Sequence, residues 1–170
     1  MFKAGDAIVH PIRGVGVVMH IEERQWRGSS EQYYRIELLG RPTTSFLTIP
    51  IKVAEKMGLR RVIPLSELKQ VWRVLCANSN ALPDDRNKRY EVIEERLHGG
   101  DIFQVAEVVR DMAWRKQQEG KITTRGKQMY DEGMGLLAGE IAVTRGIALT
   151  DAETQIRERL LKAMSPPAAM

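Results

Sequence analysis

The pattern of apolar residues changes abruptly near Pro64, and this change limits the chain to a fold with two unlike parts. Before Pro64, apolar side chains alternate with other residues, as at Val15, Val17, Met19 and Ile21, which is the two-residue period of a strand. After it, apolar side chains recur at the three- and four-residue spacing of a helix with one buried face. The sequence therefore predicts an α+β protein whose strands precede its helices.

The first part is short and contains clear turn signals. Gly28-Ser29-Ser30 and Gly40-Arg41-Pro42 separate the expected strands, so the simplest arrangement is an antiparallel meander of four or five strands. A sheet this small must close on itself or cover its edges. We therefore predict a small SH3-like or Tudor-like β-barrel over residues 1–63, with a short helix at 51–57 and a last edge strand at 60–63.

Residues 64–164 are predicted to form a compact bundle of about five helices. The expected helix starts are Ser66, Pro83 with Asp84 and Asp85, Asp101, Thr123 or Thr124, and a capping box from Thr150 to Glu153. Ile156, Leu160 and Leu161 form the apolar stripe of the last helix. The tail at residues 165–170, Ser-Pro-Pro-Ala-Ala-Met, is expected to be disordered.

Three glycines, Gly133, Gly135 and Gly139, interrupt the apolar stripe of the fourth predicted helix in this bundle. Each glycine costs about 1 kcal/mol relative to alanine inside a helix. We expect them to allow close contact between helices.

Charge and cysteine content exclude several classes of protein. The 26 Lys and Arg residues exceed the 22 Asp and Glu residues by only four, so net charge alone does not argue for nucleic-acid binding. Cys76 is the only cysteine, which excludes an intramolecular disulfide, and we expect a buried structural thiol there. The N-terminus lacks the apolar core of a signal peptide, and no run approaches the roughly 18 apolar residues of a membrane span. A cytoplasmic protein is expected.

Residues able to carry catalysis or bind a metal are scattered. The three histidines, His10, His20 and His98, lack the close spacing with Cys, Asp or Glu that a metal site needs. Gly14-Val15-Gly16 lacks the third glycine of a dinucleotide loop, and a strand follows it instead of a helix. A phosphate-binding loop and a serine nucleophile elbow are also missing from the sequence. We expect no enzyme activity, metal, cofactor or small-molecule ligand.

Two basic clusters are better candidates for binding residues. Each lies at an expected helix start, where side chains and free backbone amides can both reach phosphate. The first comprises Arg86, Lys88 and Arg89, and the second comprises Lys121, Arg125 and Lys127. The alternative is a solvated, partly salt-bridged helix face, because Glu91, Glu94 and Glu95 follow the first cluster.

The expected strand that ends near residue 26 carries a candidate protein interface. Trp26 lies between Arg24 and Arg27, and both residue types are enriched at interface anchor points. The alternative is a tryptophan folded back over the mouth of the barrel. Trp72 and Trp114 lie beside helical apolar stripes and are expected in or near the core.

Several separate blocks together resemble the CarD/CdnL family of bacterial transcription regulators. The blocks are Gly5-Asp6-x-x-Val9-x-Pro11-x-x-Gly14-Val15-Gly16-x-Val18, Ile49-Pro50 leading to Ala54 and Gly58-Leu59-Arg60, Lys88-Arg89-Tyr90, Gly100-Asp101, and Ala106-Glu107-Val108-Val109-Arg110-Asp111-Met112. The resemblance covers about residues 2–162.

The resemblance implies a Tudor-like RNA polymerase-interacting domain, shared with transcription-repair coupling factors, that docks on the lobe of the polymerase β subunit. It also implies a helical domain that contacts promoter DNA near the upstream edge of the melted −10 region, largely independently of sequence, and stabilises the open complex. Arg24 matches a family position that contacts polymerase, and Thr48 stands where some members carry a second contacting arginine. The expected polymerase-binding residues are Arg24, Trp26, Arg27, Thr48 and Pro50.

The chain departs from the family pattern at the DNA-facing motif. Family members typically have a wedging tryptophan at the position that Arg86 occupies here, and Glu91 replaces a residue that is often basic. Arginine enters a narrow minor groove but cannot fill an unstacked step as an indole does. The resemblance thus predicts weaker fork stabilisation. It leaves open a second function, a polymerase-binding adaptor without productive DNA binding, and an enzyme with an unrecognised site is the third alternative.

Overall fold

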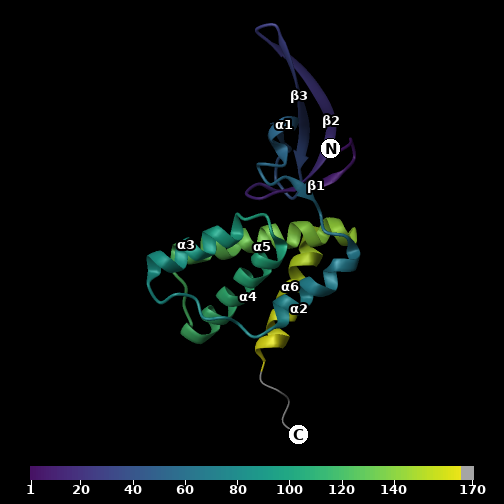
Figure 1. Cartoon of the computed structure of the whole chain (residues 1–170). Coiled ribbons are helices and arrows are strands. Elements are labelled where there is room, and N and C mark those ends of the chain that lie inside the picture. The colour runs from purple at the N-terminus through teal and green to yellow at the C-terminus, as the bar shows by residue number, and fades with distance from the viewer. Residues whose placement is uncertain (166–170) are drawn as a thin grey trace.

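The computed structural model describes residues 1–165 and consists of a five-stranded sheet followed by a helical bundle (Figure 1), which confirms the α+β prediction. The strands are β1 (Ala7–His10), β2 (Gly14–Trp26), β3 (Ser29–Leu38), β4 (Ser45–Pro50) and β5 (Arg60–Arg61). The helices are α1 (Ile51–Ala54), α2 (Leu68–Cys76), α3 (Arg86–Leu97), α4 (Ile102–Glu119), α5 (Thr124–Arg145) and α6 (Leu149–Met164), and a 3-10 turn at Leu65–Glu67 precedes α2.

Strands β1 to β4 form an antiparallel meander, as the turn signals predicted, and β5 crosses over to pair with β1, which gives the order β4-β3-β2-β1-β5. The buried face of the sheet carries Ile8, Val18, Tyr34, Ile36 and Ile49, which form a small core with Ala54 of α1 and Leu59. The hairpin turn between β2 and β3 is not Gly28-Ser29-Ser30, because Ser29 and Ser30 already pair with β2. The turn is Arg27-Gly28, and both residues have positive φ, which matches the right-handed twist of the two strands.

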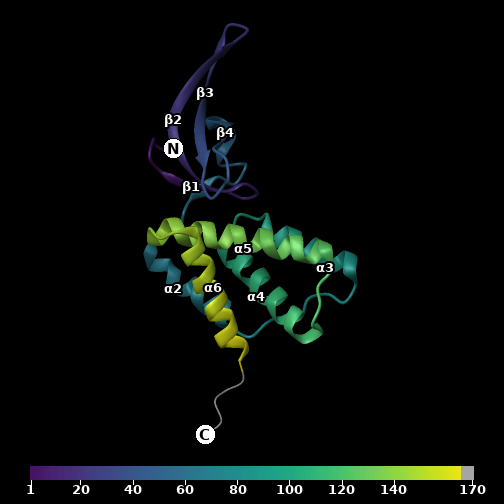
Figure 2. The ribbon, with the colours of Figure 1, turned by 180° about the vertical axis from the view of Figure 1, so that it is seen from behind.

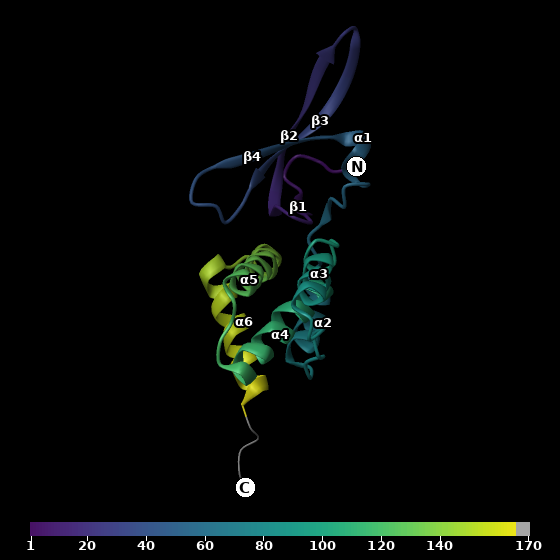
Figure 3. The same ribbon diagram turned by 90° about the vertical axis from the view of Figure 1, so that its left-hand side faces the viewer.

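The bundle has its own larger core around α4 and α5. Its fully buried residues include Val108, Val109, Leu137, Ile141 and Ile156. In all three views α5 lies directly beneath the sheet (Figures 1, 2 and 3), and it contacts β2. No helix of the described chain is long and apolar enough to cross a membrane.

The three glycines of α5 have different surroundings. A Cβ on Gly133 would lie 3.1 Å from Leu97 and 3.2 Å from Val109, so this glycine allows close helix contact as predicted. A Cβ on Gly139 would lie 3.2 Å from Val15 of β2, so this glycine brings the helix close to the sheet rather than to another helix. Gly135 has open space where its Cβ would be.

Three of the predicted helix starts are correct. Asp85 accepts a hydrogen bond from the amide of Lys88, Asp101 from that of Phe103, and Thr123 from that of Gly126. These caps satisfy free backbone amides in the first turns of α3, α4 and α5.

Two predicted starts are wrong. Ser66 lies inside the 3-10 turn, and α2 begins after Glu67 without a side-chain cap. Thr150 lies inside α6, which begins at Leu149. Leu149 is half-buried against the bundle core, and partial burial of a leucine side chain contributes an amount comparable to the roughly 1 kcal/mol of a typical cap.

Two burial predictions are also corrected. Cys76 is exposed at the end of α2, because the buried stripe of that helix runs through Leu68, Val71, Trp72 and Leu75 and is complete without it. Leu161 is exposed, since the buried face of α6 runs through Ile156 and Leu160. Trp72 is buried and Trp114 is half-buried, as expected.

The division at residue 63 and the disordered tail stay predictions. The sheet core reaches Leu59 and the bundle core begins at Ile63, which supports domains at residues 1–63 and 64–164. Within the predicted tail only Ser165 is described, and its hydroxyl donates to the carbonyl of Leu161 at the end of α6. The rest of the tail lies outside the described residues.

A charged clasp joins the sheet to the bundle. Arg60 of β5 donates two hydrogen bonds to the carboxylate of Glu140 on α5, at 2.7 and 2.8 Å, and a third to the carbonyl of Gly100. The same carboxylate accepts from the amide of Ile63 at 2.7 Å, and Thr144 donates to the carbonyl of Ile63. Glu140 is only 2% exposed, so this interaction is largely shielded from solvent.

Candidate functional site

Strand pairing gathers arginine and aromatic side chains on the side of the sheet that faces away from its core. In β3, Tyr34 and Ile36 are buried, so the alternating residues Tyr33 and Arg35 lie on the opposite face. Directly paired residues of β2 and β4 share that face. We call it the outer sheet face, and it comprises Val17, His20, Glu22, Arg24, Trp26, Ser29, Glu31, Tyr33, Arg35, Glu37, Phe46, Thr48 and Pro50.

Four of the five predicted polymerase-binding residues, namely Arg24, Trp26, Thr48 and Pro50, lie on the outer sheet face, and the fifth, Arg27, lies in the adjoining turn. Trp26 is 73% exposed, so it is not folded back over the sheet. The hairpin that carries it projects away from the bundle (Figure 3). Its tip therefore lies away from the helices of the bundle (Figure 3).

The arginines of the outer sheet face stack on aromatic rings. The guanidinium carbon of Arg24 lies 5.2 Å from the ring centre of Tyr33, and that of Arg35 lies 4.3 Å from the ring centre of Phe46. Arg35 also donates to the hydroxyl of Thr48 at 3.2 Å. Stacking orients the two guanidinium groups beside the aromatic rings, so that charged and apolar surfaces alternate along the face. Arginine and aromatic side chains are typical anchor residues of protein interfaces.

Sequence reasoning missed Tyr33, Arg35 and Phe46. The alternation of Tyr34, Ile36 and Leu38 could have predicted Tyr33 and Arg35, because it places the intervening residues of the strand on the opposite face.

Two carboxylates of the outer sheet face, Glu22 and Glu31, bind neighbouring basic side chains. Glu22 accepts hydrogen bonds from His20 at 3.0 Å and Arg24 at 3.2 Å, and these partners, His20 first, lower the pKa of Glu22. Glu31 pairs with Lys52 of α1 at 2.8 Å, and this contact is the main cause of the lowered pKa of Glu31. Both carboxylates therefore favour their charged forms and orient neighbouring cations.

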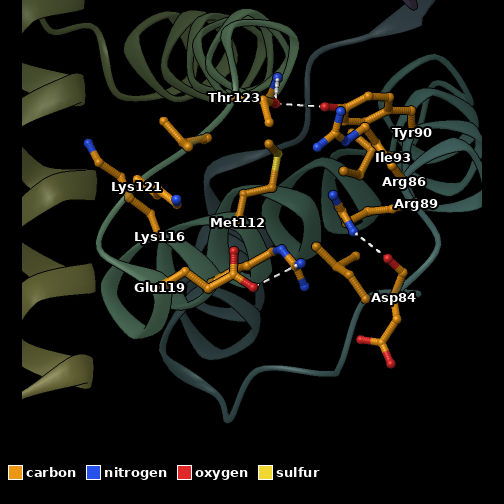
Figure 4. A pocket seen from close by; sticks show the side chains of 14 residues that line it. Asp84, Arg86, Arg89, Tyr90, Ile93, Met112, Lys116, Glu119, Lys121 and Thr123 are labelled. Carbon is orange, nitrogen blue, oxygen red and sulfur yellow. Dashed lines mark hydrogen bonds and ion pairs between the residues drawn. The ribbon is translucent and has the colours of Figure 1, made fainter.

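A cavity of about 680 Å³ lies in the helical part between α3, the end of α4 and the start of α5 (Figure 4). We call it the helix cavity. Its apolar residues are Leu82, Ile93, Met112 and Ile122. Its charged residues are Arg86, Arg89, Arg115, Lys116, Lys121, Asp84 and Glu119, and Tyr90 and Thr123 complete most of its wall.

The helix cavity brings together residues of the two predicted basic clusters. Arg86 of the first cluster and Lys121 of the second both line it. Arg89 also lines it, but this side chain is buried, and its guanidinium donates to the carbonyls of Pro83 at 3.2 Å and Asp84 at 3.0 Å. These bonds give Arg89 a structural role, because they tie it to the backbone that precedes α3, in addition to its predicted role in binding DNA.

The other predicted DNA-binding residues lie elsewhere. Lys88, Arg125 and Lys127 are exposed but do not line the helix cavity, and Arg125 approaches Glu94 to 4.0 Å. Sequence reasoning missed Arg115 and Lys116, which lie near the C-terminal end of α4. The sequence contains little indication of a binding role for these two residues. Basic side chains near the C-terminal end of a helix are common, because they interact favourably with the helix dipole.

In residues 1–165 no group of three or more His, Cys, Asp or Glu side chains is arranged to hold a metal ion.

Comparison with protein-family models divides the chain at the same place as its two cores. Residues 2–63 match the CarD-like/TRCF RID domain, and residues 70–157 match the CarD C-terminal domain. The chain belongs to the CarD family. The two matches together span most of the sheet and the bundle, so membership of the CarD family covers both candidate surfaces.

A curated relative supports this assignment. YdeB of Bacillus subtilis (strain 168), named as a candidate transcription factor, is 30% identical over 149 residues, which cover 86% of this chain and 94% of YdeB. CarD-family proteins are transcription regulators, and the RID match indicates a partner within the transcription machinery. The outer sheet face lies within the RID match, and the helix cavity lies within the CarD C-terminal match.

Proposed function

We propose that this CarD-family chain is a non-enzymatic transcription regulator that joins RNA polymerase to promoter DNA. The outer sheet face docks on the lobe of the polymerase β subunit, and the rim of the helix cavity contacts DNA near the upstream edge of the −10 bubble. The observation that carries the proposal is the exposed row of arginine and aromatic side chains within the RID match. Such a regulator acts where a bacterial chromosome is transcribed, in the cytoplasm.

The proposed DNA contact depends on the protein contact. The net charge of the chain is only +4, and non-specific affinity for DNA grows with the number of phosphates that a protein neutralises. Docking on polymerase raises the effective concentration of nearby DNA to the order of millimolar, which is enough to populate a weak contact. The contact therefore needs little sequence specificity and stabilises the open complex by recognising the forked shape.

Binding of the purified chain to a polymerase β-lobe fragment tests the docking surface. We expect wild type to bind and Arg24→Glu to abolish binding, because the substitution reverses charge in the stacked row and places a third carboxylate near Glu22 and Glu31. Lys69→Glu is the matched control, since Lys69 is exposed on α2 and distant from the outer sheet face.

No binding by wild type contradicts the docking proposal. Binding with no effect on open-complex lifetime would instead identify a polymerase-binding adaptor that lacks productive DNA contact.

A further inference from the structure

The helix cavity has more apolar surface than a contact with phosphates alone requires. Ile93 and Met112 of the packed bundle core close its floor and expose little surface of their own, whereas the half-buried side chains of Tyr90 and Ile122 present apolar surface to it. Its volume of about 680 Å³ lies within the range of about 300–1,000 Å³ that is typical of small-molecule sites.

The charged residues of the cavity favour an anion at its rim. Five basic and two acidic side chains line it, a balance of +3. Arg115 is paired with Glu119 at 2.9 Å, and Arg89 is bonded to backbone carbonyls. This leaves three cations, Arg86, Lys116 and Lys121, and one carboxylate, Asp84, and in the described part of the chain no carboxylate lies within ion-pair distance of the three cations. Figure 4 shows both lysines on one side of the cavity and Arg86 with Tyr90 on the other.

The wall of the cavity includes an aromatic ring with a fixed position. The hydroxyl of Tyr90 shares a 2.6 Å hydrogen bond with the hydroxyl of Thr123, which also caps α5. This bond joins the two helix starts that frame the cavity. Aromatic and apolar side chains accept nucleic-acid bases of any identity, because every base has a flat π-face.

Neither a simple anion nor an apolar molecule uses all of these groups. Free phosphate would leave the floor uncovered, and a hydrocarbon would leave three cations without a partner. A nucleotide has a flat, largely apolar ring and a phosphate at opposite ends. We propose that the helix cavity binds one unpaired nucleotide of promoter DNA, with its base against Tyr90 and Ile122 above the Ile93–Met112 floor and its flanking phosphates at Arg86, Lys116 and Lys121.

This inference rests on the proposed DNA contact and adds a specific ligand to it. Extruding a base from a duplex costs a few kcal/mol, but a base in an already melted strand has lost its pairing. The cavity would therefore favour forked over fully paired DNA. It would hold the fork by capturing a base, without an aromatic wedge.

Methyl-detected NMR of the full chain tests the proposal. The probe is a forked DNA oligonucleotide with a short unpaired strand, titrated at low salt, where binding in the millimolar range is still visible. We expect the methyl signals of Ile93, Met112 and Ile122 to shift with the fork and to stay unchanged with a fully paired duplex. Replacing the unpaired nucleotides by abasic residues, which keeps the phosphates, should remove most of the methyl shifts.

Ile122→Trp provides a protein-side test, because Ile122 is only half-buried and a larger side chain there would occupy the cavity. Ile122→Trp should bind forked DNA no better than duplex DNA, and its affinity for duplex DNA should equal that of wild type. Ile122→Leu should keep the preference for forked DNA. The abasic comparison uses wild-type protein and stands even if the tryptophan variant fails to fold.

The outcomes separate this inference from the proposed function. If DNA shifts the backbone amide signals of Arg86 and Lys121 but leaves the floor methyls unchanged, the cavity is not a base site and the DNA contact stands. If no DNA shifts any signal, including when the polymerase fragment is bound, the DNA contact itself is wrong. If free deoxynucleoside monophosphate shifts the methyls and forked DNA does not, the assignment to promoter DNA is overturned.

Discussion

His10 illustrates how one side chain can link the stability of the sheet to pH. Its ring nitrogen Nδ1 accepts hydrogen bonds from the amides of Ile12 and Arg13, both at 3.1 Å, and so holds the turn between β1 and β2. Burial, with a smaller contribution from Arg13, lowers the pKa of His10 below its ordinary value of 6.5. The folded state therefore prefers the neutral ring, which can accept these bonds.

The lowered pKa of His10 predicts an acid-sensitive fold. Its stabilising contribution is complete above pH 6.5 and is lost as the pH falls through the folded-state pKa, because the unfolded chain binds the proton more readily. We expect the melting temperature to fall between pH 7.5 and 5.5, and to fall less in His10→Asn, whose side-chain oxygen accepts hydrogen bonds without titrating. The difference between the two pH profiles isolates His10 from His20 and His98, and identical profiles would exclude this role.

A second single-residue prediction concerns Arg86. Stacking of a base on an aromatic side chain contributes about 1–3 kcal/mol, and an arginine in the same position fills less of an unstacked step. Arg86→Trp should therefore lengthen the lifetime of a promoter open complex by about fivefold or more, the change that corresponds to about 1 kcal/mol. Asn87→Trp is the control, because Asn87 is exposed on the same helix, does not line the helix cavity and is not a predicted DNA-binding residue. An unchanged lifetime in Arg86→Trp would show that this position does not limit fork stability.

At the scale of elements, α5 connects the two cores and shows why glycine is tolerated inside a long helix. Gly133 faces Leu97 and Val109, both almost fully buried and packed, whereas the space beside Gly135 is open. The two glycines lie two residues apart in one helix. Both glycines therefore have the same helical backbone conformation, and they differ mainly in the side chains that surround them.

These surroundings predict opposite effects of the same substitution. Gly135→Ala should raise the free energy of unfolding by about 0.5–1 kcal/mol, because alanine restricts the unfolded chain and favours the helix. Gly133→Ala gains the same preference but must displace buried side chains, and overpacking of this kind costs about 1–3 kcal/mol. Urea unfolding at constant m-value measures both. Equal stabilisation by the two alanines would show that the contact at Gly133 is not tight.

For the whole molecule, the clasp between Arg60 and Glu140 sets the position of the outer sheet face relative to the helix cavity. One carboxylate binds both the guanidinium of β5 and the amide of Ile63, where the chain passes from sheet to bundle. A protein that binds two partners in one complex benefits from a fixed distance between its two surfaces. A rigid link raises the effective concentration of the second surface at the position of its partner.

Glu140→Ala should lower the free energy of unfolding by about 3 kcal/mol, because it leaves Arg60 and the amide of Ile63 without their buried partner. At a temperature where the variant is folded, binding to the β-lobe fragment should persist while the effect on open-complex lifetime declines. Glu153→Ala is the control, since it removes a surface pair with Arg157 and should change stability by no more than about 1 kcal/mol. If the two variants behave alike, the clasp does not set the geometry.

The sequence by itself determined features that depend on near neighbours. Alternation and turn residues predicted the four-stranded meander, and helical spacing predicted the bundle. The starts of α3, α4 and α5 were predicted correctly, with Asp101 as a cap and with Thr123 or Thr124 left open for α5. The caps are interactions within a few residues, and the alternation and helical spacing are local patterns, so a short stretch of sequence is sufficient to specify them. The separate blocks that resemble the CarD family likewise identified the family that the models matched.

Only the tertiary structure decided which distant residues meet. Arg86 and Lys121 share a cavity because α3 and α5 both pack on α4, and Arg35 reaches Phe46 through strand pairing. Packing also overrode local signals, since partial burial of Leu149 starts α6 ahead of its predicted cap and the stripe of α2 leaves Cys76 exposed. Such outcomes depend on the free energy of burying whole faces against one another, which no short stretch of sequence contains.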